Sequence, residues 1–231
     1  MSEIEEIKKR YARRDAACGA SPRKFWDDFT MLAVQERERA LINALQRRFA
    51  HCDARSLTGL DIGCGVGRSL LRLIELGFEP ENIVGVELTA NRAAEARRRL
   101  PDAVRVIEGD AVTAKLPDTG FDLIEQSTVF TSILDDSVQE ALARRMWLLL
   151  RPGGVIVWYD FVYDNPRNKD VRGVLPARVR ALFPEGEMTA RRVTLAPPIG
   201  RPAARLSPLL YSALNTIPLL RSHLFAVIAK D

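Results

Sequence analysis

The sequence has few cysteines and no long hydrophobic run. Its 231 residues include three cysteines, Cys18, Cys52 and Cys64, which show no paired metal-ligand spacing and give no disulfide framework in a chain of this size. We therefore expect a reducing, cytoplasmic setting. No run is long and apolar enough to cross a membrane, and the highly charged start, residues 1–14, lacks the pattern of a signal peptide.

The chain also lacks a large excess of charge of one sign. It has 34 Lys and Arg against 30 Asp and Glu, a net charge of +4, and its arginine clusters at 97–99 and 191–192 are typical of solvated faces. No separate RNA-binding module is visible, so we expect no nucleic-acid partner. The length and a hydrophobic content of 47% suit one α/β domain with additions.

One stretch organises the rest of the chain: a short apolar strand, a glycine-rich loop and the start of a helix, over residues 57–76. The loop, residues 63–67, reads Gly-Cys-Gly-Val-Gly, and glycines let the backbone approach a ligand closely. The dinucleotide-binding pattern fails, because the third glycine comes one place early and Arg68 takes its position. No Gly-Lys-Ser/Thr follows either. Asp61, just before the loop, suits a ligand that carries a cationic group.

This stretch resembles the first motif of the class I S-adenosylmethionine-dependent methyltransferases. Segments similar to further motifs of that family follow in the same order: Val-Gly-Val-Glu-Leu at 84–88, Gly-Asp-Ala at 109–111, Phe-Asp-Leu-Ile at 121–124 and Leu-Arg-Pro-Gly-Gly at 150–154. The resemblance implies that S-adenosylmethionine is the cofactor and S-adenosylhomocysteine the product. Asp61 and Arg68 disfavour an NAD-dependent oxidoreductase.

Strand and helix patterns alternate along the chain, which is typical of a parallel, doubly wound sheet. We expect a Rossmann-like α/β fold with a mostly parallel seven-stranded sheet and an antiparallel last strand. Its expected parts are an N-terminal helical lid (1–56), the cofactor-binding core (57–195), an apolar cap insertion (196–222) and the last core strand (223–231). The family needs only a hairpin where the insertion stands, so we expect the insertion to cap an acceptor pocket.

Polar residues follow the ends of the expected strands, where open α/β sheets bind ligands. A carboxylate at Glu87 can accept hydrogen bonds from both hydroxyls of a ribose. The resemblance implies that Asp110 binds the adenine amino group, and that Tyr11 and Arg14 of the lid reach the cofactor carboxylate or an acidic substrate. The alternative for the lid is a packing helix with exposed arginines. The expected cofactor-binding set is Asp61, Gly63, Cys64, Gly65, Gly67, Glu87, Leu88, Asp110, Ala111, Gln126, Ser127, Tyr11 and Arg14.

Methyl transfer from a sulfonium is a direct displacement, and an alcohol acceptor needs a base because it loses a proton. Asp160, at the end of an expected strand, is the first candidate, with Tyr159 and Tyr163 as alternatives. Burial would raise the pKa of Asp160 and make it a better base. Asp160 could instead cap a turn or pair with an arginine. His223, beside the cap, is a further catalytic candidate.

We expect no metal, because Gln126 and Ser127 stand where metal-dependent members of the resembled family carry an acid. No Asn-Pro-Pro-Tyr tetrad follows that strand, which argues against amino methylation of DNA bases or protein amides. We therefore expect methylation of a hydroxyl on a small-molecule or carrier-linked acceptor, such as a sugar or a natural-product intermediate. The alternatives are N- or carboxyl-methylation and a non-catalytic module that binds the cofactor.

The insertion is rich in apolar residues that could pack as a cap, or could touch a membrane or a lipid-carried acceptor. We favour the cap over membrane contact, and a homodimer is left open. These residues are Leu209, Leu210, Tyr211, Leu214, Ile217, Leu219 and Leu220.

Overall fold

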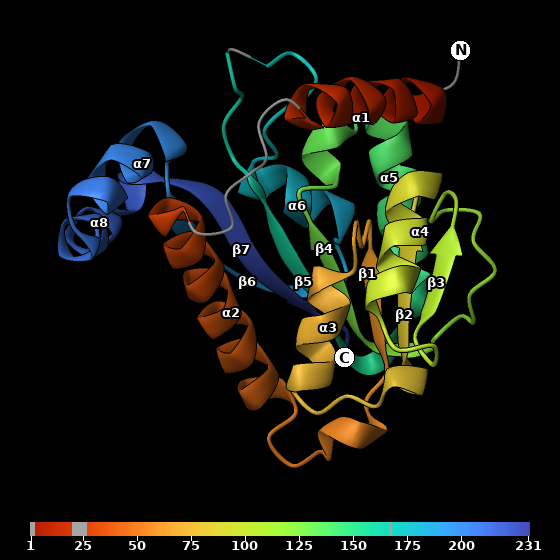
Figure 1. Ribbon diagram of the computed structural model, residues 1–231. Coiled ribbons are helices and arrows are strands. Elements are labelled where there is room, and N and C mark those ends of the chain that lie inside the picture. The colour runs from red at the N-terminus through yellow and green to blue at the C-terminus, as the bar shows by residue number, and fades with distance from the viewer. Residues whose placement is uncertain (1–2, 20–26, 167) are drawn as a thin grey trace.

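A seven-stranded sheet forms the centre of the protein, in the order β3-β2-β1-β4-β5-β7-β6 (Figure 1). The computed structural model describes residues 3–19, 27–166 and 168–231. Strands β1 to β5 pair in parallel, whereas β7 is antiparallel to both β5 and β6. This confirms the expected Rossmann-like sheet with an antiparallel last strand. The strands are β1 (Gly59–Ile62), β2 (Ile83–Glu87), β3 (Arg105–Glu108), β4 (Phe121–Ser127), β5 (Leu150–Phe161), β6 (Glu187–Leu195) and β7 (Arg221–Ala229).

Helices cover both faces of the sheet (Figure 1). On one face α2, α3 and α4 pack over Leu123 and Val157, and on the other α5 and α6 pack over Ile124 and Trp158. The longer helices are α1 (Glu3–Gly19), α2 (Asp28–Arg48), α3 (Arg68–Glu75), α4 (Ala90–Arg99), α5 (Asp136–Leu149), α6 (Pro176–Leu182), α7 (Pro197–Leu206) and α8 (Pro208–Asn215). Short 3₁₀ turns are η1 (Ala54–Ser56), η2 (Pro80–Asn82), η3 (Phe130–Ser132) and η4 (Pro218–Leu220).

The central strands are buried on both faces, because helices cover each side. In β5, residues 154–160 are all buried, which explains the near-continuous apolar run of its sequence. Consecutive residues of a strand point to opposite faces, so Trp158 packs on Phe130, with ring centroids 4.4 Å apart, while Tyr159 belongs to the opposite core cluster.

Helix α1 lies across the carboxyl edge of the sheet, above the connection between β4 and α5 (Figure 1). The Arg10 guanidinium is paired with Glu3 at 2.6 Å and donates to the carbonyl of Ser132 at 3.1 Å. Glu3 in turn accepts from the backbone N–H of Leu134 at 2.9 Å, and Ile7 is buried below. These contacts anchor α1 over the strand ends. Helix α2 instead packs against a face of the sheet, so the expected lid segment contributes to two different layers.

The insertion between β6 and β7 folds as α7, α8 and η4, beside the N-terminal half of α2 (Figure 1). Tyr211 is buried and meets the ring of Phe29 edge-on, with centroids 6.1 Å apart, and Ala203 and Ala204 complete this small core. Because β6 runs parallel to β5, the insertion leaves the sheet at the carboxyl edge. In the described part of the chain, no helix is long and apolar enough to span a bilayer.

Candidate active site

The glycine loop after β1 is hydrogen-bonded to the end of β2 and has open space beside Gly65. The backbone N–H groups of Gly63 and Cys64 donate to the carbonyl of Val86 at 2.8 and 3.0 Å. Gly65 has a φ of 56°, and a Cβ placed there would meet nothing within 4 Å. Gly67 begins α3 with a φ of 84° and lies against Leu100. The loop therefore presents the half-buried backbone of Gly65 to a space that a side chain would fill.

Glu87, at the end of β2, joins this loop to the start of α4. Its Oε2 accepts from the Gly65 N–H at 2.9 Å, while Oε1 accepts from the N–H and the hydroxyl of Thr89 at 2.9 and 2.7 Å. An oxygen of a carboxylate accepts two hydrogen bonds, so Oε2 can take a further hydroxyl, whereas Oε1 takes one only if Thr89 turns away. Glu87, which is 5% exposed, thus keeps one acceptor position, at Oε2, for a ribose hydroxyl.

Asp110 stands at the end of the next strand along the edge. Its Oδ1 accepts from the backbone N–H of Val112 at 2.9 Å, and the residue is half-buried. Ala111 is buried beside it, while Leu88 lies partly buried after Glu87. The structure therefore brings the acids expected from β2 and β3 to the same edge as the glycine loop.

Tyr11 of α1 lies between two guanidinium groups over this edge. The guanidinium of Arg14 is 4.9 Å from the centroid of its ring, that of Arg92 on α4 is 4.6 Å away, and its hydroxyl donates to Ser132 Oγ at 3.3 Å. Arg14 is thus near α4 and close to the expected cofactor site. Arg13 pairs with Asp170 at 3.0 Å, which ties the loop after β5 to the same helix.

A buried cluster of charges lies under the ends of β1 and β4. Glu125 is paired with Arg72 of α3 at 2.6 Å, and both side chains are about nine-tenths buried or more. Asp61 lies beside Glu125 in the register of β1 and β4. Burial, and next the charge of Glu125, raise the pKa of Asp61 to about 8. Asp61 is therefore largely protonated at neutral pH.

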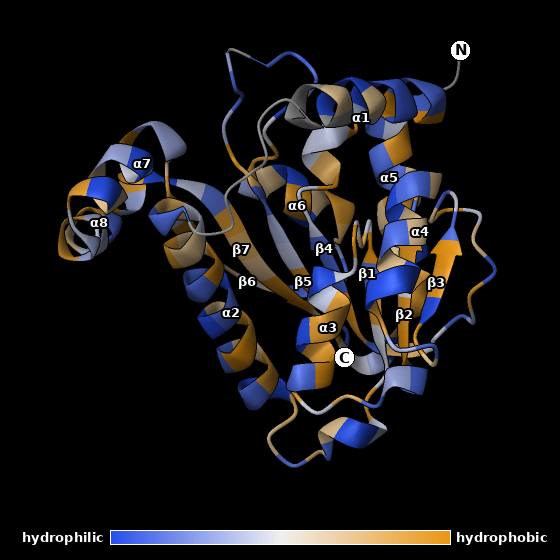
Figure 2. Cartoon of the chain, viewed as in Figure 1, coloured by the Kyte–Doolittle hydropathy of each residue, from blue (hydrophilic) through white to orange (hydrophobic). Residues whose placement is uncertain are grey.

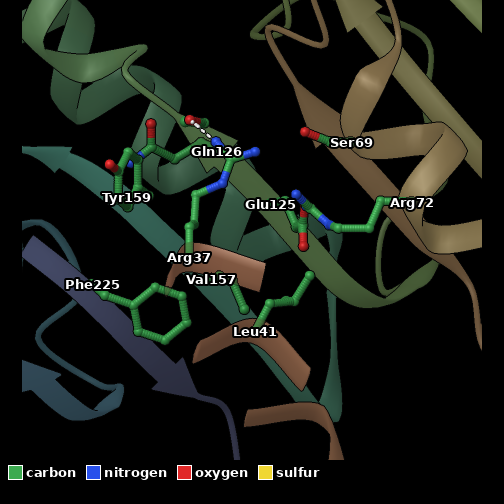
Figure 3. A pocket seen from close by; sticks show the side chains of 10 residues that line it. Arg37, Leu41, Ser69, Arg72, Glu125, Gln126, Val157, Tyr159 and Phe225 are labelled. Atoms are coloured by element: carbon green, nitrogen blue, oxygen red, sulfur yellow. Dashed lines mark hydrogen bonds and ion pairs between the residues drawn. The ribbon is translucent and has the colours of Figure 1, made fainter. Parts of the chain in front are cut away.

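Arg37 of α2 adds a second guanidinium to this cluster. Its Nη1 donates to Ser127 Oγ at 2.8 Å and the group lies 5.3 Å from the centroid of Tyr159. Among the described residues, no carboxylate lies within ion-pair distance of Arg37. Figure 3 shows it between Tyr159 and the pair formed by Glu125 and Arg72. With Asp61 protonated, the cluster carries one more positive than negative charge.

These groups border a cavity of about 10 Å³, room for about one water molecule. Four buried polar atoms around it have no hydrogen-bond partner within the described chain: Arg37 Nε, Arg72 Nε, Glu125 Oε1 and Gln126 Nε2. Such atoms are costly unless something bonds them. The three nitrogen donors could bind a ligand carboxylate, and Glu125 Oε1 could accept from a ligand ammonium. The amino-acid end of S-adenosylmethionine carries both groups. The residues present therefore fit the cofactor that the sequence implies.

Tyr159 and His223 lie on the same face of the sheet as Arg37. The two rings stack with centroids 4.6 Å apart, and Phe161 covers the imidazole at 3.8 Å. The Tyr159 hydroxyl is 2.9 Å from Thr194 Oγ1, and His223 Nδ1 is 3.0 Å from Ser222 Oγ. Burial, and next Arg37, lower the pKa of His223 to about 3, while burial raises the pKa of Tyr159 to about 12. At neutral pH the imidazole is uncharged and both groups are poor bases.

Asp160 points to the opposite face and is completely buried. Its carboxylate accepts from the backbone N–H groups of Thr131 at 3.3 Å and Phe161 at 3.1 Å. Burial raises its pKa to about 7, against the lowering effect of the bond from Thr131. This geometry argues against the predicted role as general base, because Asp160 has no surface that an acceptor could reach. Its contacts instead fix the connection between β4 and α5.

Two threonines next to this region have left-handed backbone conformations. Thr128, which follows Ser127, has a φ of 58°, and Thr194, which contacts Tyr159, has a φ of 61°. Such values are rare for β-branched residues and cost about 1–3 kcal/mol each. The strain lies at the ends of β4 and β6, on the edge where the candidate site lies.

The structure also places residues that sequence reasoning missed. Arg37 lies in the segment expected to form the lid, Arg72 lies in the helix after the glycine loop, and no role was predicted for either arginine or for Glu125. An acid inside the apolar run of β4 was a usable signal, because a buried charge requires a partner.

Cys64, a member of the glycine loop, is buried, and burial raises the pKa of its thiol. Among the described residues, no group of three or more His, Cys, Asp or Glu could hold a metal ion.

Comparison with known proteins adds independent information. The model of the methyltransferase-domain family matches residues 60–154. Trans-aconitate 2-methyltransferase of Azoarcus sp. (strain BH72) is 30% identical over 148 residues, which are 64% of this chain and 55% of that protein. Sterol 24-C-methyltransferase of Aspergillus fumigatus is 30% identical over 127 residues, 49% of this chain and 32% of that protein. The chain thus spans about a third to a half of the length of such curated relatives.

Solved structures of the same fold cover nearly the whole chain. A SAM-dependent methyltransferase from Thermotoga maritima superimposes with a TM-score of 0.64 at 17% identity, covering 98% of this chain and 99% of that one. Geranyl diphosphate C-methyltransferase from Streptomyces coelicolor A3(2), solved with S-adenosyl-L-homocysteine, gives a TM-score of 0.60 at 18% identity, covering 93% and 86%. At these identities the likeness establishes the fold.

Proposed function

We propose that the chain is a methyltransferase that uses S-adenosylmethionine and acts on an oxygen atom of a small or carrier-linked acceptor. The match of residues 60–154 to the methyltransferase-domain family model supports this proposal. The observation that carries the enzymatic part is the bond between Glu87 Oε2 and the Gly65 N–H, 2.9 Å long, beside the open space at Gly65. This bond supports a ribose-binding role for Glu87, because it holds the carboxylate next to the backbone of the proposed ligand-binding loop.

In this proposal each strand end holds one part of the cofactor. Glu87 accepts from the ribose, Asp110 accepts from the adenine amino group, and Arg37 with Glu125 receives the amino-acid end. The cavity of about 10 Å³ is smaller than that end, so the proposal requires the side chains around it, Arg37 among them, to move apart. The cofactor supplies a methyl group on a positively charged sulfur.

The chain's own contribution is orientation and the exclusion of water. Holding acceptor and methyl group in line can supply roughly 7–11 kcal/mol of the barrier. Helix α1, anchored through Arg10 and Tyr11, covers the edge where the transfer would occur. A dry site favours the reaction of a charged donor because charge is dispersed as it proceeds.

The state of the candidate bases guides the choice of acceptor. Asp160 is inaccessible, His223 is uncharged with a pKa of about 3, and the pKa of Tyr159 is about 12. A weakly acidic aliphatic alcohol would need a stronger base than these. We therefore propose an acceptor oxygen that ionises readily, first a phenol- or enol-type hydroxyl of a natural-product intermediate. A carboxyl group is the second candidate, favoured by the similarity to trans-aconitate 2-methyltransferase.

The test is transfer of tritium from methyl-labelled S-adenosylmethionine to separate panels of phenols, hydroxylated sugars and carboxylic acids. A labelled product that survives mild alkali is an ether and supports the hydroxyl acceptor. A product that releases labelled methanol in alkali is an ester and supports the carboxyl acceptor. Tight binding of S-adenosylhomocysteine with no labelled product across the panels would favour the alternative of a cofactor-binding module.

A further inference from the structure

The cap presents an apolar surface to solvent that the core does not use. Its five members, called here the cap surface, are Leu206 (77% exposed), Leu209 (81%), Leu210 (39%), Ile217 (45%) and Leu219 (78%). Figure 2 shows hydrophobic residues on α8 at the outer edge of the molecule. Single exposed leucines are ordinary, but a cluster of them marks an interaction surface.

The inward-facing apolar residues of the same segment are packed in a small core. Tyr211, Ala203 and Ala204 are buried against α2 and β6, and Leu214 and Leu220 are partly buried with them. Of the apolar residues expected to form the cap, Tyr211, Leu214 and Leu220 therefore pack inward, and a role in covering an acceptor pocket stays a prediction. The cap surface has no packing role in the described chain, so its exposure needs another explanation.

Charge distinguishes the possible partners of the cap surface. Residues 188–230 contain no Asp or Glu. Arg201 and Arg205 are both exposed on α7, and Arg205 directly precedes Leu206. Glu36 of α2 reaches the cap, but its carboxylate accepts from the N–H of Thr194 and the amide of Asn215, both at 2.9 Å. Arg205 adjoins the cap surface directly, while the Arg201 guanidinium lies 5.9 Å from the ring of Phe29 at its border. Leucines next to cations are the composition of segments that lie on anionic membranes.

A second copy of this chain is a poorer partner. A two-fold interface would place the same patch on both sides, so the arginines of α7 would meet a patch whose residues 188–230 supply no acid to pair them. A neutral hydrophobic partner would explain the exposed leucines but not the lack of acidic residues over the 43 residues from 188 to 230. An anionic bilayer offers an apolar region for the leucines and negative headgroups for the arginines.

The cap is also connected to the candidate active site. Glu36 and Arg37 are consecutive in α2: the first bonds Asn215 of the cap, and the second bonds Ser127 of the site. The insertion leaves the sheet at the carboxyl edge, where the glycine loop also lies. Attachment through the cap would therefore hold this edge of the protein near the bilayer.

We propose that the cap surface, with Arg201 and Arg205, docks the protein on an anionic lipid bilayer. The five aliphatic side chains enter the boundary between headgroups and acyl chains, and the two guanidinium groups lie among anionic headgroups. This docking does not depend on the methyl-transfer chemistry, so it can be tested on the protein without an acceptor.

The experiment is flotation of the full chain with vesicles of phosphatidylcholine alone and with vesicles that also contain phosphatidylglycerol. We expect binding to the anionic vesicles, weakened by salt. Each arginine near such a surface contributes about 1 kcal/mol, or about fivefold, so the pair Arg201→Gln and Arg205→Gln should lose about 25-fold. The pair Leu209→Ser and Leu219→Ser should lose tenfold or more, because both side chains are exposed and replaceable without loss of core packing.

A matched control is available in the pair Leu148→Ser and Leu175→Ser, which lie on other parts of the surface at 53% and 56% exposure. Vesicle binding by this control should equal that of the unmodified chain. The proposal is overturned if the unmodified chain binds no vesicles, or if control and cap variants lose binding equally. Self-association that only the cap variants abolish, without vesicle binding, would assign the surface to a second copy instead.

Discussion

Replacing Asp61 with asparagine should stabilise the protein increasingly as the pH rises from neutral to mildly alkaline. Asp61 is 2% exposed and lies beside Glu125. Burial, and next that neighbour, raise its pKa to about 8 against the opposing effect of Arg72, whereas the ordinary value is 3.8. The folded protein therefore keeps a proton on Asp61 that the unfolded chain has already lost.

The sign and size follow from proton linkage. Where the folded state binds more protons, stability falls as pH rises, by at most about 1.4 kcal/mol per pH unit for one group. For a folded pKa of about 8, the integrated loss between pH 6.5 and pH 8 is about 1.6 kcal/mol. His223 acts in the opposite direction, since its folded pKa is lowered to about 3 from 6.5: its effect makes stability fall as the pH drops, and mainly below pH 6.5. Between pH 6.5 and pH 8 the change in stability therefore comes mainly from the buried acids.

The assay is urea unfolding of the wild type and Asp61→Asn across this window. The difference in unfolding free energy between the two proteins should grow by about 1.6 kcal/mol from the lower to the higher pH. The pKa of Asp160 is raised to about 7, so Asp160 also lowers the unfolding free energy as the pH rises. It does so equally in both proteins, and its effect therefore cancels in the difference between them. Asp102→Asn, at an exposed position, serves as the control and should follow the wild type. Parallel stability curves for wild type and Asp61→Asn would show that Asp61 is ionised in the folded protein.

Three further replacements test other parts of the site. Glu87→Gln should raise the Kd for S-adenosylhomocysteine by roughly tenfold or more, since a hydrogen bond to a charged group contributes about 1.5–3 kcal/mol; unchanged affinity by calorimetry would remove Glu87 from the ribose site. Asp160→Asn should retain most of the turnover in the tritium-transfer assay, and a large loss at unchanged cofactor affinity would restore Asp160 as the base. Arg72→Met should cost about 3–5 kcal/mol in urea unfolding by leaving Glu125 buried and unpaired, and Arg72→Met with Glu125→Met should recover most of it; equal destabilisation in both would contradict a buried ion pair.

Local sequence patterns were sufficient for the sheet and the cofactor edge. The glycine loop, Glu87 and Asp110 each follow a short apolar run, and strand ends of a parallel sheet meet at one edge. The fold then brings them together without further information. Their cofactor-binding roles stay predictions until affinity is measured.

The orientation of residues within β5 could not be predicted in the same way. Tyr159 and Asp160 are neighbours, so they must face opposite sides. Both faces of β5 are buried, however, so hydrophobicity does not say which side faces the cavity. That ambiguity explains why Asp160 was expected at the crevice while its carboxylate lies against η3.

The cluster around Arg37 was hidden for a different reason. Its members come from α2, α3 and β4, and Arg37 meets Ser127 across 90 positions of sequence. No periodicity links residues that far apart. The cap shows a related limit: an apolar run does not reveal which of its leucines, such as Leu209 or Leu220, faces outward until the helix boundaries are known.

The central claim is that the open backbone at Gly65 receives S-adenosylmethionine, and two matched glycines test it. Gly65 and Gly153 both have positive φ, at 56° and 81°, and both have open space where a Cβ would stand, but Gly153 lies near the start of β5, away from the carboxyl edge. The measurement is calorimetric titration of S-adenosylhomocysteine into the wild type, Gly65→Ala and Gly153→Ala. We expect the wild type and Gly153→Ala to bind alike and Gly65→Ala to bind at least about tenfold more weakly, a change of about 1.4 kcal/mol. No binding by the folded wild type, or equal affinities in all three proteins, would contradict this account of the site.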